Sequence, residues 1–255
     1  MALKDELNNA KKVFKNETTK QKVEYIIDYY KWHIIIVLFV LIFIGNTIFT
    51  NITRKDYVLQ GIFLSTPAET ETVLDLEKDF LKKYPIDSSS EDIFFDSSLY
   101  YRPETESIDS TLSYQAIQVL TARIAAGEID FIVADDVTLN ELCYNQYFFD
   151  LSEVMTKDQM NKYGPYFLYY DREILKELNS INDTNEVVSE IVLSDPSKPE
   201  LMKDPVPIMI NVTGNDKISL LYPSFTENYA MAFFANAKNT EKALEFLEYL
   251  IESTE

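Results

Sequence analysis

The chain has 255 residues, with 42 acidic against 23 basic side chains and a formal net charge of −19. Residues 1–55 hold nine basic and five acidic side chains, which leaves 14 basic and 37 acidic ones for the rest. So acidic a chain is not expected to bind nucleic acid, because phosphates require basic partners. A single histidine, His33, and a single cysteine, Cys143, exclude histidine-based triads, internal disulfides and multi-thiolate zinc sites.

An uncharged segment runs from Trp32 to Thr53, and its centre, Ile34–Ile44, is entirely apolar. About 20 helical residues span the hydrocarbon core of a bilayer, so the segment is long enough to cross one. A buried helix of a soluble protein would normally show a polar face, and none is visible here. A cleaved secretory signal is the alternative, but no small-residue cleavage pattern follows. The segment is therefore predicted to be an uncleaved signal anchor.

The charges beside this segment predict its orientation. Four lysines lie in residues 13–32, whereas only Arg54 and Lys55 follow closely on the other side. Basic flanks favour the cytoplasmic side of a membrane. We therefore expect a basic cytoplasmic tail (1–31), a transmembrane helix (32–53) as the contact with the bilayer, and an acidic extracellular domain (54–255). The short stretch from Asn51 to Asp56 would keep this domain close to the cell membrane.

The first half of the domain alternates strands rich in Val, Ile, Tyr and Phe with helices whose apolar residues recur every three or four positions. Parallel strands need crossover connections, so this alternation predicts an α/β fold, a largely parallel sheet with flanking helices. The expected order is strand Tyr57–Leu64, a helix from a capping box at Thr66 and Glu69 to Pro85, strand Asp92–Phe95, loop Asp96–Ser113, helix Gln115–Ala126 and strand Ile129–Ala134.

The second half of the domain continues with further strands and helices. A capping box formed by Thr156 and Gln159 predicts the start of a helix. Strands are expected at Pro207–Val212 and Tyr229–Ala235, and the turn at residues 236–240 leads into a helix with apolar residues at helical spacing.

Three patches of this pattern resemble extracellular solute-binding proteins of the type 2 periplasmic-binding fold. They are the helix end, Gly-acid turn and strand of Ala125–Asp135, the aromatic segment Phe148–Ser152, and the Asn-rich turn 236–240 with its helix. The resemblance implies a periplasmic-binding-protein-like lobe. In that family a second lobe is inserted before the closing strand and helix, and ligand lies between the lobes.

The segment available for a second lobe is short. It runs from Tyr166 to Asp204, and about 40 residues fall well below the usual size of an independent domain. A single, reduced lobe is therefore favoured over a compact two-lobed form, which stays open as the alternative.

Two functions follow from the resemblance and the anchor. The favoured one is an accessory or interaction subunit that contacts a membrane-protein partner, associated with an ABC transporter; the alternative is a receptor that delivers a small solute to such a transporter. No enzymatic activity, cofactor or metal site is expected, and the pair Asp135 and Asp136 fits a strand end or helix cap better than a calcium site. Open α/β sheets bind ligands beyond the carboxyl ends of their strands, which predicts these contact residues for any ligand: Ser65, Thr66, Asp96, Ser97, Asp135 and Asp136.

The chain is also rich in aromatic residues, with 17 tyrosines and 16 phenylalanines. Exposed tyrosines suit protein contacts, because the ring provides area and the hydroxyl a polar group. We consider Tyr100, Tyr169 and Tyr222 as contact residues, with a tyrosine-rich core as the open alternative.

Overall fold

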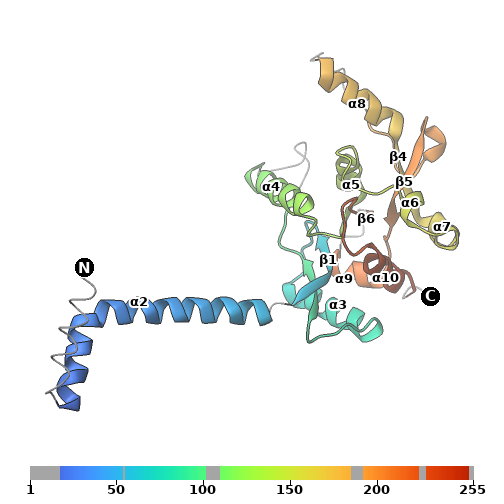
Figure 1. The fold of residues 1–255 in the computed structure, drawn as a ribbon. Helices are drawn as coiled ribbons and strands as arrows, with labels where there is room; N and C mark the ends of the chain where they lie inside the picture. Colours follow the sequence, from blue (N-terminus) through green and yellow to red (C-terminus); the bar gives the residue numbers. More distant parts are fainter. Residues whose placement is uncertain (1–17, 54, 102–109, 185–191, 224–227, 253–255) are drawn as a thin grey trace. The chain divides into compact units, whose positions relative to one another are not determined.

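The computed structural model describes residues 18–53, 55–101, 110–184, 192–223 and 228–252. The chain divides into two compact units, Met1–Arg54 and Lys55–Glu255 (Figure 1). The described part of the first unit is dominated by one long helix, and that of the second is an α/β domain.

The first unit contains helix α2 (Thr19–Thr53), which is 35 residues long. Its window Tyr30–Thr47 is long and apolar enough to cross a membrane. None of the side chains in this window is buried in the structure, and that of Phe39, for example, is 72% exposed. The predicted span of 32–53 therefore falls within one continuous helix, which begins earlier, at Thr19. The cytoplasmic tail and the extracellular location of the domain stay predictions.

The six strands of the described residues form one sheet, in the order β2-β1-β3-β6-β5-β4. Strand β1 is parallel to both β2 and β3, whereas the β3–β6, β6–β5 and β5–β4 pairings are antiparallel. The expected α/β class is confirmed, but the sheet is mixed: β4 and β6 run against the other four strands. The strands are β1 (Asp56–Phe63), β2 (Glu91–Asp96), β3 (Phe131–Asp135), β4 (Phe167–Asp171), β5 (Pro205–Asn211) and β6 (Tyr229–Phe233).

Helices cover both faces of the sheet (Figure 1). One face packs against α3 (Thr70–Lys83), α6 (Leu151–Val154), α7 (Lys157–Tyr163), α9 (Asp216–Leu221) and α10 (Thr240–Ile251). The other face packs against α4 (Ser110–Ala126), α5 (Asp136–Cys143) and the first turns of α8 (Arg172–Thr184). Two short 3-10 helices complete the described elements, η1 (Gly164–Tyr166) and η2 (Pro199–Leu201).

The core under α3 and α10 is a cluster of phenylalanines. The Phe131 and Phe246 rings stack with centroids 4.8 Å apart, and edge contacts add three more rings: Phe63, Phe80 and Phe95. Gly61 lies directly under this cluster, and a Cβ atom there would come within 2.1 Å of the Phe131 ring. Glycine is therefore required at this position by the close approach of the ring.

The starts of two helices, α3 and α4, differ from the sequence expectations, and the start of α7 agrees with them. Helix α3 begins at Thr70 with Glu69 as N-cap, so the expected capping box at Thr66 is wrong. The Thr66 hydroxyl instead donates to the carbonyl of Leu221, 2.5 Å away. The hydroxyl that was expected to cap the helix is therefore bonded to a residue distant in the chain. Helix α4 starts at Ser110, inside the expected loop. The capping box at α7 is confirmed, with both of its reciprocal bonds present.

The segment expected to form a second lobe extends the same sheet. It supplies β4, α8 and η2, and β4 pairs with β5 at the end of the sheet. The outer side of β4 contacts the loop around Pro196, where the Tyr169 N–H donates to the Pro196 carbonyl at 2.9 Å. Figure 1 shows α8 leaving the sheet from the end of β4.

Candidate functional site

The predicted contact residues lie at the carboxyl ends of the three parallel strands. Ser65 and Thr66 follow β1, Asp96 is the last residue of β2 with Ser97 after it, and Asp135 ends β3 with Asp136 opening α5. Because β2, β1 and β3 are parallel neighbours, these six residues share one edge of the sheet. Their role in binding a ligand stays a prediction.

Ser65 has an unusual backbone conformation for a residue other than glycine, with φ at 57°. Left-handed conformations cost free energy in side-chain-bearing residues and persist where neighbouring groups hold them. Here the Ser65 hydroxyl donates to the carbonyl of Tyr101 at 2.5 Å and accepts from the Tyr101 N–H at 2.9 Å. The Ser65 N–H in turn donates to the carbonyl of Leu99. The side chain therefore fixes a turn.

Tyr222 joins the ends of β1 and β3 from inside the protein. Its hydroxyl lies 3.0 Å from the carbonyl oxygen of Leu64 and 2.9 Å from that of Val133, and its ring stacks on Tyr229 with centroids 4.3 Å apart. Burial raises the pKa of this hydroxyl well above its ordinary value, so it stays a donor. The prediction that Tyr222 is a surface contact residue is wrong, because the side chain is only 3% exposed.

At the end of β2, Asp96 is held by its neighbours. One carboxylate oxygen pairs with the guanidinium of Arg123 at 2.5 Å, and the other accepts from the backbone and hydroxyl of Ser98. Both partners of the ion pair are largely shielded from solvent, so the pair ties α4 to the edge of the sheet. Ser97 beside it is half-buried.

The two aspartates after β3 also have local roles. Asp135 caps helix α5 by accepting from the Thr138 N–H at 2.8 Å, which agrees with the expected helix cap. Asp136 accepts from the side-chain amide of Asn228 at 3.2 Å, and its own N–H donates to the Asn228 carbonyl. Burial raises the pKa of Asp136. This edge therefore uses most of its polar side chains to hold strands and helices together.

Few groups at this edge remain for polar chemistry. Within the described ranges, no group of three or more His, Cys, Asp or Glu side chains is placed to hold a metal ion. Cys143 is buried, and burial raises the pKa of its thiol, which keeps it protonated and unreactive. The large apolar side chains near the edge are exposed instead: Tyr100 is 44% and Val137 is 59% exposed.

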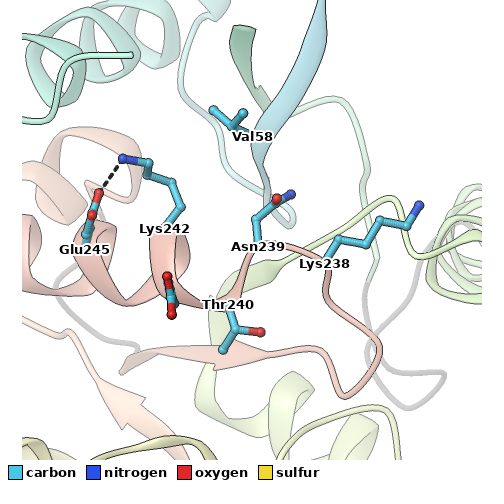
Figure 2. A pocket seen from close by; sticks show the side chains of 7 residues that line it. Val58, Lys238, Asn239, Thr240, Lys242 and Glu245 are labelled. Carbon is cyan, nitrogen blue, oxygen red and sulfur yellow. Dashed lines mark hydrogen bonds and ion pairs between the residues drawn. The ribbon is translucent and has the colours of Figure 1, made fainter. Parts of the chain in front are cut away.

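Three cavities lined by described residues lie away from these six positions, with volumes of about 530, 180 and 280 Å³. The largest lies beside the start of α10, and Figure 2 shows Lys238, Asn239 and Thr240 around it, with Val58 opposite. Its charged side chains balance, because two lysines face two glutamates and Lys242 pairs with Glu245 at 2.6 Å. Such a balanced lining does not favour an anionic or a cationic ligand.

Comparisons of the chain with protein-family models, with curated proteins and with solved structures find no match. The resemblance to solute-binding proteins therefore stays a hypothesis drawn from the residue patches quoted above.

Proposed function

We propose that this chain is a membrane-anchored accessory subunit, whose extracellular domain resembles one lobe of a solute-binding protein and contacts a membrane-protein partner. The observation that carries the proposal is the place of the segment between Tyr166 and Asp204. Its described part extends the existing sheet through β4, so it does not supply a lobe that closes over the carboxyl edge.

The chemistry of the carboxyl edge supports the same proposal. A site for a small polar solute needs several convergent polar groups that are not already satisfied within the protein. Here Ser65, Asp96 and Asp135 are bonded to their own turns and helices. The exposed side chains of Tyr100 and Val137 offer aromatic and aliphatic area, which suits contact with another protein.

The anchor limits where such a partner resides. Helix α2 is long enough to cross a membrane, and only residues 54 and 55 separate it from β1. A fully extended residue adds at most about 3.6 Å, so the domain works within a short distance of the bilayer. The proposed partner is therefore itself a membrane protein, and the family resemblance suggests an ABC-type permease.

Protease treatment of intact cells tests the topology. With tags at both ends of the chain, we expect loss of the C-terminal tag and survival of the N-terminal one. Permeabilised cells, in which both tags are cut, serve as the control. Loss of the N-terminal tag alone from intact cells would overturn the proposed orientation.

Thermal unfolding with added solutes separates the accessory role from the receptor alternative. A ligand present at 100 times its dissociation constant adds about 2.7 kcal/mol to the stability of the folded state. We expect no shift of the unfolding temperature with sugars, amino acids or short peptides. A shift that disappears in Asp135→Ala, in a variant that still folds, would establish a solute receptor instead.

A further inference from the structure

Two exposed aromatic side chains meet where the domain begins. Tyr57, the second residue of β1, is 48% exposed, and Phe94 of the edge strand β2 is 39% exposed. Their ring centroids lie 5.8 Å apart. Single exposed apolar side chains are common on soluble proteins, but two large rings in contact form a shared surface whose burial would be favourable. We call these two side chains the aromatic corner.

The aromatic corner lies on the face of the sheet that α4 covers. The residues on either side of Phe94 point into the core under α3, so the alternation along a strand directs Phe94 to the opposite face. There the Arg123 guanidinium of α4 lies 5.8 Å from the centre of the Phe94 ring. Along β1 the exposure falls from Tyr57 to Phe63, which is fully buried. The core therefore leaves this end of the strand open.

The charges next to the aromatic corner are balanced, although the domain as a whole is acidic. Asp92 and Asp96 share the face of β2 that carries Phe94. Asp92 forms an ion pair with Lys55 at 3.5 Å, and Asp96 pairs with Arg123 at 2.5 Å. A surface whose carboxylates are paired is repelled less by anionic lipid headgroups than the rest of this domain.

The length of chain between the anchor and the corner indicates what covers it. Helix α2 ends at Thr53, and Tyr57 follows four residues later. Because a fully extended residue adds at most about 3.6 Å, the Cα atom of Tyr57 lies within about 14 Å of that of Thr53. The headgroup layer on each side of the hydrocarbon core is itself about 5–8 Å thick. With the membrane span at 32–53, Tyr57 therefore stays close to this layer however the domain is turned.

We infer that the aromatic corner lies in the headgroup layer, so that the domain contacts lipid through Tyr57 and Phe94 in addition to its anchor. Tyrosine is enriched at this level of the bilayer, because its ring is apolar and its hydroxyl polar. The inference rests on the membrane anchor of the proposed function, but not on its protein partner. Strand β1 has eight residues, so its ends are about 23 Å apart. The carboxyl edge, at the other end of β1, remains accessible to that partner.

Quenching of tryptophan fluorescence by lipid tests the inference on the full-length chain in vesicles. Trp32 is the only natural tryptophan, so Phe94→Trp is combined with Trp32→Phe. The vesicles contain no other protein and consist of phosphatidylcholine brominated near the headgroup end of its acyl chains. The matched control is Leu74→Trp in the same background, a 45% exposed position of α3 on the opposite side of the sheet. We expect the loss of emission from Phe94→Trp to be roughly twofold that of the control.

The wild-type chain distinguishes failure of this inference from failure of the anchor. Its Trp32 lies at the start of the predicted span, so its emission is quenched if α2 crosses the bilayer. Unquenched Trp32 would overturn the anchor and this inference together. Quenched Trp32, with equal losses from Phe94→Trp and Leu74→Trp, would overturn this inference alone. Both substitutions are at exposed positions, and unchanged circular dichroism checks the fold.

Discussion

The two halves of the sheet are built differently. In β2-β1-β3 the strands are parallel, and each connection between consecutive strands contains a helix. The aromatic cluster around Phe131 and Phe246 covers one face of this half. In β6-β5-β4 every pairing is antiparallel, and β6, the last strand along the chain, lies between β3 and β5. The parallel half thus follows from local alternation of strands and helices. The antiparallel half follows from pairings that no local pattern predicts, and one of its strands, β4, comes from the segment that was the candidate for a second lobe.

The largest expected effect concerns the aromatic cluster. Phe246→Ala removes a fully buried ring that contacts Phe63, Phe80, Phe95 and Phe131, so we expect a loss of about 3–5 kcal/mol in the free energy of unfolding. Urea denaturation of the full-length chain in detergent measures it. Leu175→Ala, in α8 at the margin of the antiparallel half, is the control and should cost clearly less. Equal losses would show that the two halves contribute alike.

A smaller effect is expected where glycine meets the cluster. Gly61→Ala places a methyl group within the Phe131 ring, and overpacking of a filled core costs about 1–3 kcal/mol. Combining it with Phe131→Leu, which removes the ring, should restore part of the loss. The double-mutant cycle measures this coupling. Strictly additive effects of the two substitutions would contradict the close approach described here.

The carboxyl edge of the parallel half depends on the hydroxyl of Tyr222. Tyr222→Phe leaves the buried carbonyls of Leu64 and Val133 without this donor, and we expect a cost of about 1–2 kcal/mol. Hydrogen exchange should localise the change to the ends of β1 and β3. Tyr166→Phe, at a 45% exposed position, is the control and should change stability little. An unchanged free energy of unfolding in Tyr222→Phe would contradict the role assigned to this hydroxyl.

The smallest expected effect is a dependence of the stability on pH, caused by Glu77, whose carboxyl bonds the backbone of the edge strand β2. Burial raises the pKa of Glu77 to about 6, against the opposing effect of the Phe95 N–H, which donates to this carboxyl at 2.6 Å. The folded chain therefore holds the proton more tightly than the unfolded one. The stability that this adds is complete below pH 4.5 and is lost as the pH rises through about 6.

Glu77→Gln keeps an acceptor for the Phe95 N–H but does not titrate. Its stability relative to the wild-type chain should therefore rise between pH 4.5 and 6 and stay constant above. Urea denaturation across this range measures the difference. The same difference at all pH values would contradict the raised pKa.

The sequence predicts the local parts of this structure well. Three features depend only on neighbours in the chain, so the sequence alone predicts them. They are the apolar run of α2, the capping box at Thr156 and the alternation of strands and helices from Tyr57 to Ala134. The shared edge of the six predicted contact residues also follows from parallel neighbours. Three features escape sequence reasoning because their partners are distant: Thr66 bonds Leu221, Tyr222 bonds Leu64, and β4 joins the sheet through β5.

Photo-cross-linking in living cells tests the central proposal most directly, that the domain acts by contacting a membrane protein. A photoreactive phenylalanine replaces Tyr100 at the carboxyl edge, and in a matched chain it replaces Tyr166, which is equally exposed at 45% beside the antiparallel half. We expect irradiation to attach one defined membrane protein at Tyr100, identified by mass spectrometry, and to attach it far less at Tyr166. Absence of any protein adduct at Tyr100, together with solute binding by the same chain, would contradict the proposal.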